Sequence, residues 1–288
     1  MKNRVFRAGL WLGMLSLALF GGCSSAPKRP VAVFTIKNKV TTQLELVHKA
    51  MDQGNYEQAL DLLEEARRLS ISTDDPELLI REGLARGNIL YALGRTEEAD
   101  AIWNRALAEA ELAGAAELAG IVRIYKARSM LLADGATADT VKTQVRTELG
   151  AIGSDKLSLA LGWTVIGLAE KEQRRWSEAE GALQKALAIH EKDNYLEQAA
   201  YDWFLIASVR SMAGQYAGAL DALGKAIGFD RRAENTYGLG MDWRAQGDVY
   251  KKMGESDEAA DAYRRSAAIF RSIFLEQEAL QVESRLTP

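Results

Sequence analysis

The chain has 288 residues, of which 48% are hydrophobic and 26% are charged, and its formal net charge at pH 7 is −4. Its single cysteine excludes an internal disulfide, and two histidines with one cysteine supply too few ligands for a soft-metal site, so we expect no metal. The acidic balance argues against nucleic acid as a partner and against electrostatic adhesion to anionic lipid.

The first 22 residues have the pattern of a secretory signal peptide. Lys2, Arg4 and Arg7 precede an apolar run from Leu10 to Phe20 that is too short to span the hydrocarbon core of a bilayer, which is about 30 Å thick. Without residues 1–22 the chain has 33 basic and 40 acidic residues, a net charge of −7. We therefore predict an exported protein whose mature body is acidic.

The segment Phe20-Gly21-Gly22-Cys23-Ser24 resembles the lipobox of bacterial lipoproteins, in which small residues precede the acylated cysteine. The resemblance implies that Cys23 carries acyl chains, palmitate among them, and each buried CH₂ of such a chain contributes about 0.8 kcal/mol to membrane binding. By analogy with enterobacterial sorting, Ser24 after the cysteine implies the outer membrane, with the protein facing the periplasm. An inert buried thiol is the alternative interpretation of a lone cysteine.

Residues 23–40 are predicted to form a tether. Pro27 and Pro30, with two basic residues between them, favour an extended and mobile first part. The stretch from Val31 to Ile36 is apolar and β-prone, so we expect it to pack along the first repeat, with strand addition to a partner's sheet as the alternative.

Residues 41–288 repeat in a frame of forty residues. Alanine recurs in it at Ala59, Ala99, Ala179, Ala219 and Ala259, glycine at Gly54, Gly94, Gly214 and Gly254, and tryptophan at Trp163, Trp203 and Trp243. Self-similarity with a period of 20 to 50 residues indicates a solenoid, in which each unit buries its apolar face against its neighbours. Apolar residues at helical spacing on both sides of the glycine turn predict two helices per unit.

The second and third units carry local signals of their own. Asp75-Pro76-Glu77 predicts the start of a helix, with an aspartate N-cap and proline at the first helical position. In the third unit Asp134, Asp139 and Arg146 stand where other units have glycine or alanine. There we expect a looser helix pair, because its second helix keeps only a narrow apolar stripe, which includes Val141.

The sixth unit shows the pattern most clearly. It reads Trp243-x-x-Gln246-Gly247-x-x-Tyr250, then a turn at Gly254, then Ala259-x-x-x-Tyr263. Small residues such as Gly247 and Ala259 let helix axes approach to about 8–10 Å. Glu278 to Leu286 has the mixed apolar and charged composition of a capping helix.

This pattern resembles the tetratricopeptide repeat, with a period of forty residues instead of the usual ~34. The other matching positions are Gly54-Asn55-Tyr56 and Ala59, then Gly87, Ala99 and Trp103, then Trp163, Ile166, Gly167, Ala179 and Leu183, and finally Trp203, Gly214, Tyr216 and Ala219. The resemblance implies an all-α, right-handed α-α superhelix of about six helix pairs.

Motifs of catalysis and cofactor binding are absent from the sequence. It has no His-Glu-x-x-His, no phosphate-binding loop and no Gly-x-Ser-x-Gly, and Gly238-Leu239-Gly240 lacks the third dinucleotide glycine because Trp243 stands there. Acidic pairs such as Glu64-Glu65 are typical of solvated helix faces. His190 lies near the end of a predicted helix, where an imidazole suits the helix dipole. We expect neither enzymatic activity nor a cofactor.

The resemblance also implies a concave groove lined by the first helix of each pair. Carried over by register, the groove positions are Leu44, His48, Arg81, Leu84, Asn88, Tyr91, Leu168, Lys171, Tyr201, Phe204, Arg244, Asp248 and Lys251. The third unit is left unassigned. Aromatic and aliphatic side chains in the middle and Arg244, Lys251 and Lys252 at one end favour an amphipathic or extended peptide with an acidic end.

These features predict a membrane-anchored, periplasm-facing scaffold that binds a protein or peptide, for assembly or recruitment of a complex of the cell envelope. The alternative is a small-molecule-binding accessory lipoprotein of a periplasmic transport system. An enclosed apolar cavity would favour the alternative, and an open trough would favour the scaffold.

Overall fold

A computed structural model describes residues 35–52, 55–131, 137–153 and 155–286 of the chain. The predicted signal peptide, Cys23 and most of the tether lie outside the described residues, so these predictions remain predictions. Within the described ranges no helix is long and apolar enough to cross a membrane.

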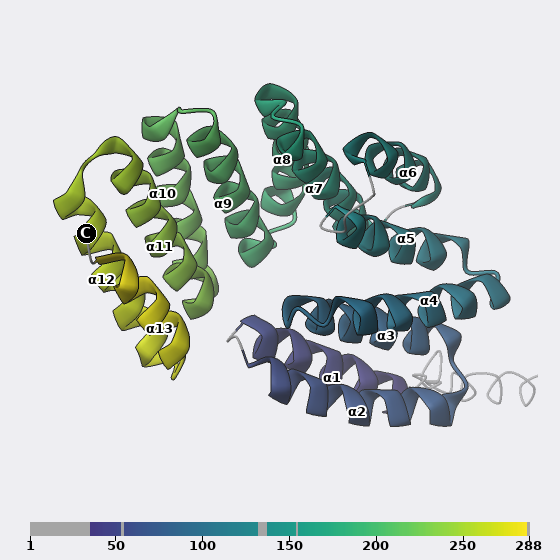
Figure 1. The fold of residues 1–288 in the computed structure, drawn as a ribbon. Helices are drawn as coiled ribbons and strands as arrows, with labels where there is room; N and C mark the ends of the chain where they lie inside the picture. Colours follow the sequence, from purple (N-terminus) through teal and green to yellow (C-terminus); the bar gives the residue numbers. More distant parts are fainter. Residues whose placement is uncertain (1–34, 53–54, 132–136, 154, 287–288) are drawn as a thin grey trace, which may run out of the picture. The chain divides into compact units, whose positions relative to one another are not determined.

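The described residues form α-helices and one short 3-10 helix, and they contain no β-strand. Six consecutive helix pairs are followed by a capping helix, as predicted (Figure 1). The pairs are α1 (Thr35–Asp52) with α2 (Tyr56–Thr73), α3 (Pro76–Ala92) with α4 (Thr96–Leu112), α5 (Ala116–Met130) with α6 (Ala138–Ala151), α7 (Lys156–Glu172) with α8 (Trp176–Lys192), α9 (Leu196–Met212) with α10 (Tyr216–Ala233), and α11 (Thr236–Met253) with α12 (Ser256–Ser272); α13 (Glu276–Glu283) and η1 (Ser284–Leu286) close the array.

Two helix starts test the sequence predictions. Asp75 caps α3 as expected, because its Oδ1 accepts hydrogen bonds from the backbone N–H groups of Glu77 at 3.0 Å and Leu78 at 3.4 Å. The first repeat, however, begins at Thr35 and not at residue 41. The helix starts early because Val40, near its first turn, is fully buried in the core of the first pairs.

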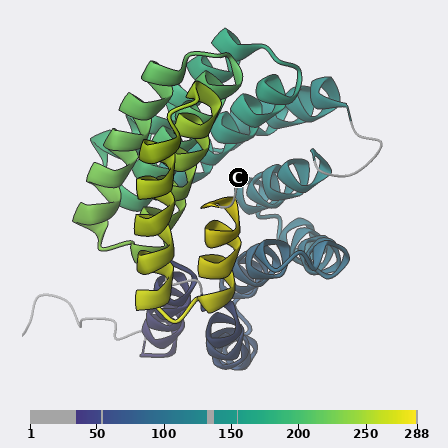
Figure 2. The ribbon, with the colours of Figure 1, turned by 60° about the vertical axis from the view of Figure 1, so that its left-hand side comes forward.

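Each helix packs on the one before it and the one after it, and the two layers of the array differ. The first helices also contact one another, α1 with α3, α3 with α5, α5 with α7 and α9 with α11, whereas contacts of this extent do not join second helices within the described ranges. The first helices therefore lie on the inner, shorter side of the stack. α1 in addition touches α11, so the inner faces of distant pairs approach each other (Figure 2).

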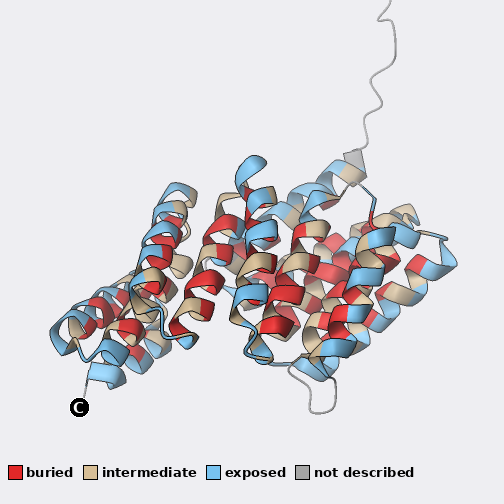
Figure 3. Ribbon diagram, turned by 90° about the horizontal axis from the view of Figure 1, so that it is seen from above, coloured by how far each residue is buried: buried red, intermediate tan, exposed pale blue. Residues whose placement is uncertain are grey.

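Buried residues lie on the faces that neighbouring helices share, and exposed residues lie mainly on the outside (Figure 3). Close approach depends on glycines of the first helices. A Cβ added to Gly247 would lie 2.5 Å from the ring of Tyr263, and one added to Gly167 would lie 2.7 Å from Leu183. The close approach of the two helices expected at Gly247 is present, and the side chain that packs against Gly247 is the ring of Tyr263.

The third pair, α5 with α6, is formed but packs less extensively than the other five pairs. Val141 and Val145 are fully buried, so the narrow apolar stripe is used as predicted. Asp139, which interrupts the alanine series, stays exposed and pairs at 2.8 Å with Lys142. The buried Lys142 also reaches Glu170 of α7 at 3.1 Å, so ion pairs replace part of the missing apolar contact.

Candidate functional site

The candidate site is the inner surface formed by α1, α3, α5, α7, α9 and α11, called here the first-helix surface. All thirteen predicted groove residues belong to these helices, and they differ in exposure. His48, Arg81, Tyr201 and Lys251 are exposed, Leu84 is buried, and Leu44, Asn88, Tyr91, Leu168, Lys171, Phe204, Arg244 and Asp248 are half-buried.

Several predicted residues are engaged within the fold. Leu84 packs in the hydrophobic core, because its position on α3 faces the next pair instead of the groove. Arg81 pairs at 3.0 Å with Glu77 of its own helix. Asp248 accepts hydrogen bonds from Tyr263 Oη at 2.8 Å and Arg285 Nη1 at 2.6 Å. These side chains support the helices around the surface.

Aromatic rings and one arginine meet in the middle of the surface. The guanidinium of Arg128, on α5, lies 4.8 Å from the centre of the Tyr91 ring and 5.9 Å from that of Tyr125, within range of cation–π attraction. Burial raises the pKa of Tyr201 on α9, and Arg128 opposes the shift. Tyr201 nevertheless exposes about half of its surface. Arg128 was missed because the third unit had no assigned register.

The first pair faces the same space. Burial lowers the pKa of His48 on α1, and the charge of Glu197 on α9 opposes that shift. The His48 side chain itself remains exposed. The charge of Glu197 on α9 therefore acts on His48 of α1.

Phe204 of α9 divides two hollows in the surface. The ring of Tyr201 stacks near it, with centroids 6.4 Å apart and planes 12° apart. One pocket, of about 160 Å³, lies between the C-terminal parts of α9 and α11 and includes Phe204, Ser208 and Asp248. Lys252, predicted at the basic end of the groove, donates a hydrogen bond to Ser211 Oγ at 2.8 Å beside it.

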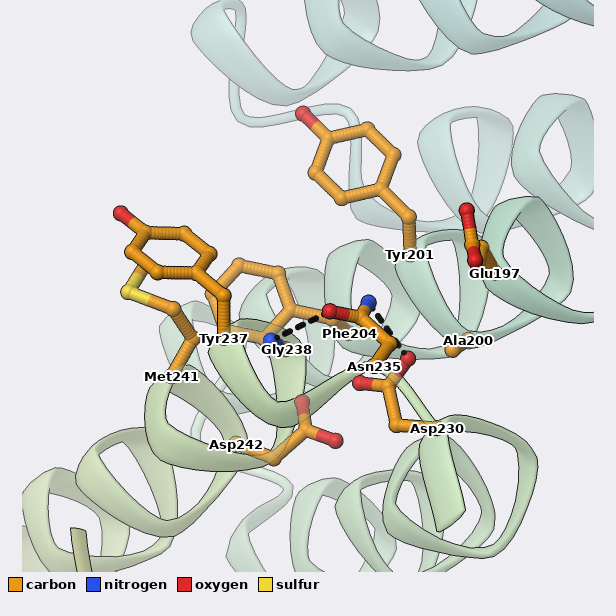
Figure 4. A pocket seen from close by; sticks show the side chains of 10 residues that line it. All are labelled: Glu197, Ala200, Tyr201, Phe204, Asp230, Asn235, Tyr237, Gly238, Met241 and Asp242. Carbon is orange, nitrogen blue, oxygen red and sulfur yellow. Dashed lines mark hydrogen bonds between the residues drawn. The ribbon is translucent and has the colours of Figure 1, made fainter. Parts of the chain in front are cut away.

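The second hollow, called here the α9–α11 pocket, has a volume of about 150 Å³ (Figure 4). Its lining residues come from three helices and one turn: Glu197, Ala200, Tyr201 and Phe204 of α9, Asp230 of α10, Asn235 of the turn, and Tyr237, Gly238, Met241 and Asp242 of α11. Apolar groups, among them aromatic rings and a thioether, supply almost all of the accessible lining. The carboxyl groups of Asp230 and Asp242 lie side by side at the pocket and are almost completely buried (Figure 4).

The turn between α10 and α11 fixes the acidic wall. Asn235 Nδ2 donates to Asp230 Oδ1 at 2.9 Å, and Asn235 Oδ1 caps α11 by accepting from the backbone N–H of Gly238 at 2.9 Å (Figure 4). A Cβ at Gly238 would clash with the Asp230 carboxyl and with the Asn235 amide. Glycine at this position therefore lets α11 begin directly against Asp230.

Asp242 lies deeper in the same wall. It is only 2% exposed and its carboxyl group faces that of Asp230, whereas its Oδ2 accepts no hydrogen bond from an N–H or hydroxyl donor in the part of the chain that the structure describes. Burial raises the pKa of Asp242, and the neighbouring Asp230 raises it further. Burial also raises the pKa of Asp230, which Asn235 opposes. Such a pair holds protons at pH values where isolated carboxyl groups have lost them.

Sequence reasoning missed this acid pair because a helical pattern does not show which residues of two helices face each other. The available signal was Asp242 itself, which stands directly before Trp243 inside an otherwise apolar stripe. Across the described ranges, no cluster of three or more histidine, cysteine or acidic residues is arranged to hold a metal ion.

Comparison with known sequences identifies repeats in two segments. Residues 164–192 and 245–272 each match a family model described as tetratricopeptide repeat. No curated protein sequence matches the chain.

Three solved structures illustrate the fold that this chain shares. A Rap protein complexed with competence and sporulation factor is 16% identical, with a TM-score of 0.58 over 86% of this chain and 73% of that chain. PilW, a widely conserved type IV pilus biogenesis factor, is 17% identical, with a TM-score of 0.51 over 84% and 98%. PlcR of Bacillus thuringiensis, in complex with the peptide PapR7 and DNA, is 13% identical, with a TM-score of 0.54 over 89% and 77%. The chain thus contains tetratricopeptide repeats and has a solenoid fold of the tetratricopeptide type.

Proposed function

We propose that the chain is a scaffold that binds a protein or peptide partner on its first-helix surface, in the assembly or recruitment of an envelope complex. The observation that carries the proposal is the aromatic centre of that surface. Tyr201 remains 51% exposed and stacks beside Phe204, between two pockets that Phe204 divides. Exposed aromatic side chains next to pockets are typical anchors of protein interfaces.

The sizes of the pockets favour a peptide over a small-molecule ligand. They measure about 150 and 160 Å³, and both open onto the surface. Sites for drug-sized ligands usually enclose about 300–1,000 Å³. Two shallow hollows on either side of an aromatic ring fit successive side chains of an extended or helical segment. The PlcR structure, solved with the peptide PapR7 and DNA, and the Rap structure, solved with competence and sporulation factor, support a peptide or protein ligand for this fold.

The proposal includes the repeat length and the anchor. A forty-residue unit is supported by three cation–π contacts in which each partner recurs after forty residues: Lys185 over Trp163 at 4.0 Å, Lys225 over Trp203 at 4.3 Å and Arg265 over Trp243 at 4.7 Å. The anchor is supported by the sequence alone, in which acylated Cys23, followed by Ser24, holds the scaffold at the outer membrane, facing the periplasm.

The binding surface is tested by changing Tyr91, Phe204 and Arg244 together to alanine in cells and comparing crosslinked partners with those of the parent protein. We expect loss of the main crosslinked species. The matched control changes Leu112, Arg264 and Phe274, which are exposed away from the first-helix surface, and keeps the species. Circular dichroism verifies that the triple variant is folded. An unchanged set of crosslinked partners in the folded variant would refute the hypothesis that the partner binds on the first-helix surface.

The anchor has a separate test. Cys23→Ser removes the acylated thiol, so the protein should move from the membrane fraction to the soluble fraction. Metabolic labelling with a palmitate analogue should mark the parent protein and not the variant. Retention of the variant in membranes would contradict the lipid anchor and leave the binding surface unaffected.

A further inference from the structure

Two neighbouring helix pairs place an aspartate at the same point of their first helix and surround it differently. In the pair that begins with α9, Asp202 is 1% exposed, and its Oδ2 lies 2.6 Å from His190 Nδ1 on α8. Thr164 of α7 donates a hydrogen bond to the other oxygen of Asp202 at 3.4 Å. His190 was expected only to suit a helix dipole, but its ring supplies the partner of a buried acid.

Forty residues further along the chain the acid is kept and its partners are changed. Asp242 occupies on α11 the place of Asp202 on α9, because these helices begin at Thr236 and Leu196. At the position of His190 stands Asp230, and at the position of Thr164 stands Phe204. A base and a hydroxyl are thus replaced by a second acid and an apolar ring. Asp242 then has only the facing carboxyl group of Asp230, and among the described residues no N–H or hydroxyl group donates to its Oδ2.

The α9–α11 pocket opens where those partners would be. Both Phe204 and Asp230 line it, together with Asp242. Glu197 of α9 adds a third carboxyl group at the rim, and the lining residues include no basic side chain. Asp202 has a base beside it, whereas Asp242 has a cavity at the matching place. We therefore expect the cation that would compensate Asp242 to come from another molecule.

We propose that the α9–α11 pocket receives the cationic head of a lysine or arginine side chain from the partner, with Asp242 and Asp230 as its acceptors. This assignment rests on the proposed function and names the chemistry of the partner: a basic residue enters the surface at this pocket. It differs from the acidic peptide end that the sequence alone suggested, because Lys251 and Lys252 lie at the other end of α11 and Arg244 is not among the lining residues of the pocket.

The walls of the pocket select this class of cation. Phe204, Tyr237 and Met241 offer aromatic faces and a thioether to an aliphatic stem, and aromatic faces also attract the charged head. A volume of about 150 Å³ corresponds to about five water molecules at about 30 Å³ each, which is the scale of one long side chain. A metal ion would require several converging ligands, and among the described side chains no such group occurs.

Calorimetry of the full chain with defined probes tests the proposal. The probes are the blocked peptide Ala-Ala-Lys-Ala-Ala, the same peptide with norleucine in place of lysine, and n-butylammonium chloride. The lysine peptide should bind at least about tenfold more tightly than the norleucine peptide, because only the ammonium group satisfies the acid pair. It should also exceed n-butylammonium by a similar factor, because a partner's backbone contacts the surface around the pocket.

Two variants connect that binding to the acid pair. Asp242→Asn should weaken binding of the lysine peptide at least about tenfold, whereas Asp221→Asn, which changes an exposed acid of α10, should leave it unchanged. Asp230→His should also abolish binding, because it rebuilds the base found at His190. Circular dichroism verifies folding of each variant.

The outcomes separate this inference from the proposed function. Equal binding of the lysine and norleucine peptides, or undiminished binding by both folded pocket variants, would overturn the cation pocket. Equal affinity for n-butylammonium and the lysine peptide would overturn the assignment to a partner and point to a small organic cation. Loss of lysine-peptide binding in Asp242→Asn while the triple variant, which also removes the Phe204 wall of the pocket, keeps all crosslinked partners would refute the scaffold surface. It would also refute the assignment of the pocket to a partner, and only a pocket that binds a free organic cation would remain.

Discussion

Asp202 and Asp242 lie at matching points of α9 and α11, and both are almost completely buried. Asp202 is held by His190 at 2.6 Å and by Thr164, so its burial is compensated inside the fold. Asp242 faces the carboxyl group of Asp230 and a pocket, and within the described ranges no N–H or hydroxyl group donates to its Oδ2. The aspartate at this helix position thus has a histidine and a threonine as partners in one pair, and only a second carboxyl group beside a pocket in the next.

The comparison teaches how a repeat array gains a site without changing its architecture. Stability in such arrays is approximately a sum over units and their interfaces, so one unit can lose favourable contacts while its neighbours hold the stack. The exchange from His190 to Asp230 removes a compensating base, and Gly238 leaves room for the new acid against α11. A binding site built in this way lowers local stability, as functional sites commonly do.

The largest expected effect breaks the compensated pair. His190→Ala leaves Asp202 buried without its base, and we expect the free energy of unfolding to fall by about 3 kcal/mol, as for other buried pairs that lose one partner. Urea unfolding followed by circular dichroism measures the change, and hydrogen exchange locates it in α8 and α9. The matching variant Asp230→Ala should cost less than about 1 kcal/mol, because no compensated pair exists there. Equal losses in the two variants would contradict the comparison.

The second prediction concerns a substitution that removes the repulsion between Asp230 and Asp242. Asp242→Asn removes one of two facing carboxyl groups and supplies an amide that donates to Asp230, so stability at pH 8 should rise by about 1 kcal/mol. Asp202→Asn should instead lower stability, since it weakens the bond to His190. The thermal midpoints of the two variants at pH 8 should therefore shift in opposite directions, and shifts of the same sign would show that the two aspartates are equivalent.

The third prediction concerns pH. Burial raises the pKa of Asp230 to about 7 and that of Asp242 to about 9, whereas unfolded aspartate titrates near ~3.9. Groups with a raised pKa in the folded state contribute stability that is complete below about pH 4 and is lost as pH rises through the folded values. The loss is at most about 1.4 kcal/mol per pH unit for each proton held only by the folded state.

The difference in free energy of unfolding between the parent protein and Asp242→Asn isolates this contribution. The parent should become less stable relative to the variant between about pH 5 and 9. Other charged or titratable groups at the pair are Glu197 of α9, which raises the pKa of Asp230 further, and Tyr237 of α11. A difference that stays constant across this range would mean that the acid pair titrates normally.

Much of the fold could be predicted because its determinants are local. Alanine and glycine series mark the helix contacts, and Asp75-Pro76 marks a helix start, all within stretches that one helix or turn contains. The start of α1 at Thr35 was missed because a polar run around Lys37 and Lys39 hides the buried Val40.

The candidate site was less accessible to prediction because it depends on which residues face each other across helices. Register places Phe204 at the first-helix surface, but Leu84, at the same position of the forty-residue frame, is buried in the core. The acid pair required knowledge that a residue near the end of α10 meets one on α11, twelve positions later. A comparison of His190 and Asp202 with Asp230 and Asp242 in the forty-residue frame would have indicated it.

The smallest expected effect lies in the turns that precede the two aspartates. Asn194 and Glu234 occupy matching positions with φ of 60° and 58°, in the left-handed region that asparagine tolerates better than glutamate. Glu234→Asn should therefore raise stability by about 0.5 kcal/mol, and Asn194→Glu should lower it by a similar amount. Paired thermal melts measure both changes.

These opposite changes separate backbone conformation from the chemistry of the acids. Glu234 is exposed, so its replacement removes no buried contact, and the neighbouring Asn235 still caps α11. If the turn sets only the local backbone energy, Glu234→Asn will stabilise the protein without altering binding of the lysine peptide. A change in that binding would mean that the strained turn positions Asp230, because Asn235 joins the turn to this carboxyl group through a hydrogen bond of 2.9 Å.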